Sequence, residues 1–295
     1  MASRKHGNFG GDWTEEKLDR LAQYLPAYTN IFKGRTYKYA YIDAFAGPGH
    51  RARERKQGAP TQDLWSEDLD ERGRRFTAGS ALVAMRSEPP FQSYIFIEHD
   101  ASALAKLEET LRSEFPQRIS RAKFEAGDAN VVLRRLCDRN WSKHRAVLFL
   151  DPYGMEVEWS TMEAIASTQA IDVWILFPAG IGVNRQLPAS GNVTVWARTA
   201  FDRLFGTPNW YDRFYAKHAT GDMFGGPDRI QKLASSDEIV AYYRERLNGI
   251  FPHVAPNPLV LSNSNNAPMF ALFFAAAHPK YGATAVKIAQ DVLKA

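Results

Sequence analysis

Short runs of strand-forming residues recur through the first 180 residues of the chain, and stretches with helical spacing separate them. The runs lie at 37–43, 93–100, 122–130, 146–154 and 171–178. They lack the alternation of apolar and polar positions that a half-exposed strand shows, and parallel strands covered on both faces have this property. Strands that alternate with helices predict an α/β fold with a mostly parallel sheet.

Polar residues with capping chemistry mark the starts of several predicted helices. Asp12, with Glu15 three residues on, predicts the start of an opening helix with apolar residues at helical spacing. Asp100 predicts the start of a helix after the second strand. Ser160 and Glu163 predict a capping box for the helix after the fourth strand.

Three segments depart from this alternation. Residues 50–78 are dense in charge, which predicts a loop insertion ahead of a helix over 79–87. Residues 185–250 are rich in aromatic side chains and predict a helical insertion with an aromatic core, with a base-stacking platform as the alternative. Residues 258–263 and 268–279 predict an antiparallel hairpin at the edge of the sheet. We expect one domain with a Rossmann-like, seven-stranded sheet and helices on both faces.

Composition predicts a soluble, globular protein. Of the 295 residues, 45% are hydrophobic, yet no apolar run reaches the roughly 18 residues of a membrane span. The first residues carry charge without an apolar stretch behind them, so no signal peptide is expected. The single cysteine, Cys137, fits a reducing cytoplasm; we expect it to be a buried helix residue, with a catalytic thiol as the alternative.

Charge and histidine content indicate which kinds of ligand to expect. The net charge of +4 and the pI of about 9.0 are compatible with a polyanionic partner such as RNA or DNA without being diagnostic of one. A basic cluster, "RARERK" (51–56), follows the first strand and is either a solvated face or a phosphate contact. The seven histidines form no cluster with ligand spacing, so no metal site is expected.

The strongest chemical signal is a set of carboxylates at the ends of predicted strands, where ligands of an open parallel sheet bind. These acids are Asp43, Glu98, Asp128 and Asp151. Gly47 and Gly49 follow the first of them and allow the backbone to approach a bound nucleoside closely. An acid after the second strand can accept hydrogen bonds from both ribose hydroxyls, and one after the third can accept from an adenine amino group.

Each acid also has a structural interpretation. Asp43 can cap a turn, Glu98 and Asp128 can sit at helix starts, and Asp151 can belong to an ordinary strand exit. The stretch "GPGHRA" also fits a loose dinucleotide fingerprint. Its proline removes an amide that would face pyrophosphate, and Glu98 lies far beyond the roughly 20 residues expected for the ribose acid. A nicotinamide cofactor is therefore the weaker alternative.

The same residues resemble motifs of class I S-adenosylmethionine-dependent methyltransferases. "DAFAGPG" (43–49) is similar to the first motif of the nucleic-acid enzymes, and "DPYG" (151–154) to a shortened D/N/S-P-P-Y/F motif of amino-group methyltransferases. The resemblance implies S-adenosylmethionine as cofactor. The cofactor-binding residues that it implies are Asp43, Phe45, Gly47, Gly49, Glu98 and Asp128.

The "DPYG" resemblance implies catalytic roles for Asp151, Pro152 and Tyr153. In the amino-group enzymes the acid and a proline carbonyl accept the hydrogens of the target amino group, and the aromatic ring stacks on a flipped base. Tyr153 can equally pack on the protein. The second proline of the motif is missing here, which leaves the amino-group target open.

More narrowly, the chain resembles the three-Cys-motif partner family. The resemblance runs through "DWTEEKL" (12–18), "YIDAFAGPG", "GS" (79–80), "FIEHD", "GDAN", "FLDPYG" and "FFAAAHP" (273–279). It implies association with a separate protein that carries a three-cysteine, iron–sulfur type cluster. We therefore expect methyl transfer to a nucleic acid, with a base amino group as one candidate acceptor. The alternatives are a methyltransferase-like binding subunit without turnover and a small-molecule methyltransferase.

Overall fold

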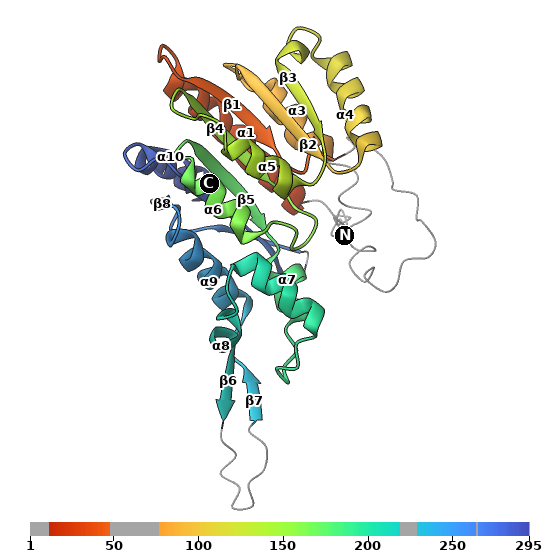
Figure 1. Ribbon diagram of the computed structural model, residues 1–295, viewed down its shortest axis with the longest axis vertical. Helices are drawn as coiled ribbons and strands as arrows, with labels where there is room; N and C mark the ends of the chain where they lie inside the picture. The colour runs from red at the N-terminus through yellow and green to blue at the C-terminus, as the bar shows by residue number, and fades with distance from the viewer. Residues whose placement is uncertain (1–11, 48–76, 219–228, 264, 295) are drawn as a thin grey trace, which may run out of the picture.

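The computed structural model describes residues 12–47, 77–218, 229–263 and 265–294, and it shows one central sheet flanked by helices (Figure 1). The strands of this sheet are β1 (Lys38–Asp43), β2 (Ser93–Glu98), β3 (Ala122–Ala126), β4 (His144–Leu150), β5 (Ile171–Phe177), β8 (His253–Val254), β9 (Leu259–Ser262) and β10 (Pro268–Ala276). The helices are α1 (Asp12–Phe32), α3 (Thr77–Arg86), α4 (Ala101–Glu114), α5 (Ala129–Cys137), α6 (Trp159–Ser167), α7 (Val195–Phe205), α8 (Trp210–Phe214), α9 (Ser236–Asn248) and α10 (Gly282–Lys294). Short 3-10 or π turns cover Ile119–Arg121, Ala179–Val183 and Asn184–Gln186.

The strand order is β3-β2-β1-β4-β5-β10-β8, and β9 pairs with the other end of β10. Strands β1 to β5 are parallel, while β10 runs antiparallel to β5 and to its outer neighbours. Because β8 and β9 share the outer edge of β10, the eight strands fill seven positions. This confirms the expected Rossmann-like methyltransferase fold with an antiparallel edge.

Each face of the sheet has its own apolar core. Side chains alternate along a strand, so Tyr41 points into a core with α1, α3, α4 and α10, while its neighbour Ile42 points into a core with α5, α6, α7 and α9. Tyr41 and Ile42 are both fully buried. The sequence runs of β1, β4 and β5 lack alternation because both of their faces are covered.

The predicted helix starts have mixed outcomes. Asp100 caps α4 as expected and accepts hydrogen bonds from the amides of Ser102 and Ala103. The Ser160 capping box is wrong, because α6 begins at Trp159, after Glu158. The Glu158 amide is bound by the side chain of Asn130, which sets the entry into α6 from outside the helix. Helix α1 begins at Asp12, and its first side chains lie outside the described residues.

The predicted helical insertion contains α7, α8 and α9, but also a β-hairpin that the sequence pattern did not reveal. The hairpin pairs β6 (Tyr215–His218) with β7 (Arg229–Lys232) and extends away from the main sheet in Figure 1. As expected, the aromatic residues mostly form a core: Phe201, Phe205, Trp210 and Phe214 are almost completely buried. Trp196 is an exception, with 49% of its surface exposed.

The remaining expectations concern Cys137 and the charged segment. Cys137 ends α5 and packs partly against the core, where burial raises the pKa of its thiol to about 12. It is therefore a packed thiol and not an activated one. The predicted charged insertion, including "RARERK", falls almost entirely on 48–76, outside the described residues. No described helix has the length and apolar character needed to cross a membrane.

Candidate functional site

Three of the four predicted acids lie at the ends of β1, β2 and β4. These strands are neighbours in the sheet, with β1 in the middle. Asp43 ends β1 and lies opposite Phe96 of β2 and Phe149 of β4. Glu98 comes two residues after Phe96, and Asp151 comes two residues after Phe149. The parallel topology therefore gathers Asp43, Glu98 and Asp151 at one edge of the sheet.

Asp43 is fully buried at this edge. Its Oδ2 accepts a hydrogen bond from the hydroxyl of Tyr41 at 3.2 Å, and its Oδ1 has no hydrogen-bond partner among the described residues. Burial raises the pKa of Asp43 to about 7, and the charge of Asp151 adds to the rise. The Ser80 hydroxyl, the Tyr41 hydroxyl and the backbone of Phe45 oppose this rise. A buried, half-satisfied carboxylate is rare without a function.

The turn after β1 is tied to Glu98. Gly47 has a φ of 61°, a left-handed conformation that favours glycine. Its amide donates to Glu98 Oε2 at 2.9 Å, and the amide of Asp100 donates to Oε1 at the same distance. Each carboxylate oxygen keeps a second lone pair, so Glu98 can still accept from a ligand hydroxyl. Gly49 lies outside the described residues.

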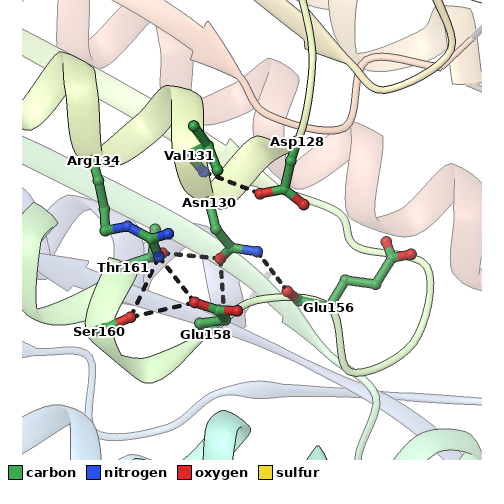
Figure 2. Close-up of polar contacts among 8 residues, drawn as sticks. All are labelled: Asp128, Asn130, Val131, Arg134, Glu156, Glu158, Ser160 and Thr161. Carbon is green, nitrogen blue, oxygen red and sulfur yellow. Dashed lines mark hydrogen bonds and ion pairs between the residues drawn. The ribbon is translucent and has the colours of Figure 1, made fainter.

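Two further predicted cofactor residues have structural contacts. Asp128 is exposed and caps α5 through a hydrogen bond from the amide of Val131 to Oδ1 at 3.0 Å (Figure 2). Its structural interpretation is therefore correct, and Oδ2 makes no hydrogen bond with the residues drawn there. Phe45 is half-buried and packs against the core on the α5 and α6 face. A contact of either residue with a cofactor stays a prediction.

Asp151 forms an ion pair that the sequence patterns did not reveal. The ammonium of Lys17, on α1, lies 2.5 Å from Asp151 Oδ2. Lys17 is only 6% exposed, whereas the side chain of Asp151 keeps 24% of its surface accessible. A buried lysine thus reaches across from the N-terminal helix to the predicted catalytic acid.

The other two residues of the predicted acceptor motif differ in exposure. Pro152 is buried, and Tyr153 has 50% of its surface exposed. The Tyr153 amide donates to Glu156 Oε2 at 3.2 Å, and Gly154 takes a φ of 82°, so the chain turns sharply here. Tyr153 therefore has a half-exposed ring at this turn.

The loop from Asp151 to Glu158 is fixed by Asn130, which is 7% exposed at the second position of α5. The Asn130 amide nitrogen donates to the carbonyl of Glu156 at 2.9 Å. Its oxygen accepts from the amide of Glu158 and from the hydroxyl of Thr161, both at 2.9 Å. Figure 2 shows these three bonds converging on one side chain between α5 and the start of α6.

Arg134 reinforces the same junction. Its guanidinium donates to Glu158 Oε2 at 2.9 Å and to the hydroxyl of Thr161 at 3.0 Å (Figure 2). Both are charge-assisted contacts to residues that Asn130 also binds. The loop that carries Asp151 is therefore supported by two side chains of α5.

Lys17 and Asn130 were missed as site residues, although a signal for Lys17 exists. Lys17 precedes Leu21 by four residues and Tyr24 by seven, so it shares their buried face of α1. A lysine on a buried, apolar helix face is almost always paired with another polar or charged group. Asn130 stands in "GDAN", and no sequence pattern singles it out.

The residues present fit a nucleoside-type cofactor. The left-handed Gly47, the oxygens of Glu98 and the unpaired Oδ1 of Asp43 offer acceptors and open backbone at one strand edge. They would hold ribose and amino groups of S-adenosylmethionine, which supplies an electrophilic methyl group when bound. The described residues contain no group of three or more acidic, histidine or cysteine side chains suited to a metal ion.

Comparisons with known proteins find no match in sequence and distant similarities to solved structures. No family model matches the chain, and no curated protein matches it in sequence. Among solved structures, protein LPL1258 from Legionella pneumophila is similar over 98% of this chain and 93% of its own, with 13% identity and a TM-score of 0.47. Trm1 from Pyrococcus horikoshii, solved with S-adenosyl-L-methionine, is similar over 92% of this chain and 57% of its own, with 10% identity and a TM-score of 0.44. Spermidine synthase from Thermotoga maritima covers 90% of this chain and 60% of its own, with 10% identity and a TM-score of 0.42. The strand order carries the fold assignment, and the three-Cys-motif partner resemblance gains no support from these matches.

Proposed function

We propose that this protein transfers a methyl group from S-adenosylmethionine to a nucleic acid. One observation carries the proposal. At the junction of β1, β2 and β4, a left-handed Gly47 turn is bonded to Glu98 and lies beside the buried, half-satisfied Asp43. Glu98 would hold the ribose hydroxyls, and the second oxygen of Asp128 would accept from the adenine amino group.

The acceptor would bind beside Asp151 and Tyr153. Both follow β4, the neighbour of β1, so the acceptor lies next to the cofactor side of the edge. The half-exposed ring of Tyr153 can stack on a base, a contact worth about 1–3 kcal/mol. The basic pI of about 9.0 is compatible with a polyanionic acceptor such as RNA or DNA.

Calorimetry with S-adenosylmethionine and with its demethylated product tests the cofactor. We expect binding at micromolar to millimolar concentrations that Glu98→Gln weakens. Absence of binding at millimolar ligand would overturn the proposal. Radiolabelled methyl transfer to RNA and DNA then tests turnover.

A second candidate is a methyltransferase-like subunit that works with a three-cysteine, iron–sulfur type partner without turnover of its own. The observation in its favour is an exposed apolar pair at the start of α7, where Val195 is 83% and Trp196 49% exposed. Transfer assays with and without such a partner separate the two functions. Cofactor binding without transfer under either condition favours the subunit.

A further inference from the structure

Positive charge is concentrated in the insertion at 185–250. The described residues of this insertion include nine lysines and arginines and five acidic residues. The remaining described residues include 19 lysines and arginines and 20 acidic residues, so they carry no excess of positive charge. Within the part of the chain that the structure describes, the insertion is therefore the region whose charge suits a polyanion.

Helix α7 connects this insertion to the loop that carries the predicted acceptor residues. Gly206 follows α7 with a φ of 68°, and a Cβ atom at this position would overlap the ring of Trp159. Trp159 is the first residue of α6, directly after the loop from Asp151 to Glu158. A ligand that lies along α7 therefore leads toward this loop.

The outer face of α7 carries an aromatic ring that the core does not use. Val195 is 83% exposed and Trp196 is 49% exposed, whereas Phe201 and Phe205 on the inner face of the same helix are completely buried. Arg203 follows Trp196 after seven residues, so it shares the outer face, and it is also exposed. An exposed indole is a surface on which a base can stack.

A stack of planar groups holds the guanidinium of Arg198 in place. Its central carbon lies 4.1 Å from the centroid of the Tyr211 ring, and the rings of Tyr211 and Tyr215 are 4.8 Å apart. The two tyrosine hydroxyls donate to the carbonyls of Gly191 and Pro188, at 2.9 and 3.0 Å. Among the described residues no acidic side chain pairs with Arg198, which is exposed. A guanidinium held in this way is suited to contact a phosphate.

These features favour a single-stranded nucleic acid over the other possible occupants of this face. A single strand offers bases that can stack on Trp196 and phosphates that can contact Arg198. A duplex keeps its bases stacked on one another and offers no open ring face. A protein partner that covered only Val195 and Trp196 would leave the unpaired Arg198 and the excess of positive charge without a role.

We propose, resting on the nucleic-acid acceptor proposed above, that the outer face of α7 binds a single-stranded segment of the substrate. Trp196 stacks on one base, and Arg198 contacts a phosphate. Trp196 precedes Gly206 by ten residues, which corresponds to about 15 Å of helix. A stacked strand rises about 3.4 Å per nucleotide, so the bound strand extends roughly four or five nucleotides along α7.

Equilibrium binding tests the role of Trp196. Single-stranded RNA and DNA of about 15 nucleotides, and duplexes of the same sequence, are titrated with protein that holds the demethylated cofactor. Trp196→Ala should weaken binding of the single strands about 5- to 100-fold, the contribution of one stacked base, and leave duplex binding unchanged. The matched control is Tyr281→Ala, because Tyr281 is 48% exposed and follows β10 at the opposite end of the sheet.

Both variants should keep the melting temperature of the wild type, because both side chains are exposed. Equal affinity of Trp196→Ala and Tyr281→Ala for the single strands overturns the stacking role. A loss of duplex binding as large as the loss of single-strand binding overturns it as well. If only RNA or only DNA binds and Trp196→Ala weakens that complex, the result supports the surface and identifies the type of strand.

Salt dependence tests the role of Arg198. Arg198→Gln should reduce the slope of log affinity against log salt concentration by about 0.7, the value of one phosphate contact on a single strand. Arg198→Lys should keep the slope of the wild type, because it keeps the charge, but bind less tightly, because lysine loses the planar stack on Tyr211. The exposed Arg139→Gln is the control. Equal slopes in Arg198→Gln and Arg139→Gln overturn the phosphate contact.

Methyl transfer to short and long strands separates this inference from the proposed function. A trinucleotide at the acceptor loop is too short to reach Trp196, so Trp196→Ala should methylate it as fast as the wild type does. A strand of about 15 nucleotides, at concentrations below saturation, should be methylated about 5- to 100-fold more slowly by Trp196→Ala. Equal rates of wild type and variant on both substrates overturn this inference alone. If neither substrate is methylated but Trp196→Ala still weakens strand binding, the surface is supported and the proposed methyl transfer is overturned.

Discussion

The turn after β1 and the loop after β4 end neighbouring strands, yet different contacts fix them. The turn is held by Glu98, whose carboxylate accepts directly from Gly47 and Asp100. The loop is held by Asn130, which binds the backbone of Glu156 and Glu158. The carboxylate of Asp151 pairs with Lys17 instead. Under the proposed function, Glu98 would serve both local structure and cofactor binding, whereas on the Asp151 side these two tasks would be divided between residues. Substitutions should separate the two sides accordingly.

The largest effect is expected at Asp151. Asp151→Asn keeps an oxygen for Lys17 but removes the charge, so methyl transfer should fall by about 10²- to 10⁴-fold. The cofactor dissociation constant should change less than threefold, because Glu98 and Gly47 are untouched. Transfer kinetics and calorimetry measure the two quantities, with the exposed Asp138→Asn as control. Wild-type transfer rates in Asp151→Asn contradict a catalytic role.

A smaller loss of activity is expected when the support of the loop is removed. Asn130→Ala deletes three hydrogen bonds and leaves the hydroxyl of fully buried Thr161 without its bond to Asn130. Displacement of the loop by about 1 Å can cost roughly 100-fold in rate, and the unpaired groups should lower the free energy of unfolding by about 1–3 kcal/mol. Transfer kinetics and urea denaturation measure both effects.

The exposed Asn192→Ala is the control for this prediction. Asn130→Asp keeps the oxygen that accepts from Glu158 and Thr161 but cannot donate to the carbonyl of Glu156. An intermediate rate in Asn130→Asp would indicate that positioning of the loop, more than folding, limits transfer. Equal transfer in Asn130→Ala and Asn192→Ala would contradict the supporting role.

The sequence predicted the framework of this site because strand ends are marked locally. Asp43, Glu98 and Asp151 each follow an apolar run, and the parallel order of strands brings such positions together without further information. The same local reasoning cannot distinguish a structural role from a ligand-binding role for a single side chain. Asp128 caps α5, and nothing in its neighbourhood along the chain says whether it also meets a ligand.

Contacts between distant segments were beyond sequence patterns. Lys17 and Asp151 are separated by 134 positions, and their pairing depends on how α1 packs over the sheet. The start of α6 was misplaced for a similar reason, because Asn130 on another helix binds the amide of Glu158. The hairpin of β6 and β7 was missed because its aromatic flanks suggested helices.

Glu98→Gln should weaken both cofactor binding and the hydrogen bonds that hold the turn after β1. A neutral amide can accept at only one of its two end atoms, so one of the amides of Gly47 and Asp100 loses its partner. We expect cofactor affinity to fall about 10- to 100-fold, from the loss of one charge-assisted bond worth about 1.5–3 kcal/mol. Calorimetry measures this, with the exposed Glu109→Gln on α4 as control. Unchanged affinity would remove Glu98 from the cofactor site.

The smallest effect concerns Asp43 and pH. Burial raises the pKa of Asp43 from 3.8 to about 7, so the folded protein binds a proton that the unfolded chain releases above about pH 4. Its contribution to stability is fully present below pH 4 and is lost as the pH rises toward 7. Asp43→Asn carries no charge at any pH, so without cofactor it should lose less stability than the wild type as the pH rises to 8.

A second carboxyl, that of Asp172, contributes to the same pH dependence. Burial also raises the pKa of Asp172 to about 7. The contributions of both carboxyls to the stability of the protein are therefore lost in the same pH window. Urea denaturation at pH 4.5, 6 and 8 should therefore show a reduced pH dependence in Asp43→Asn and a further reduction when Asp172→Asn is added. Asp43 lies at the cofactor edge and Asp172 opposite Ala276 near the other end of the sheet, so their effects should add. If Asp43→Asn keeps the full pH dependence of the wild type, Asp43 is ionised in the folded protein, and the turn after β1 then carries a fixed negative charge beside Asp151.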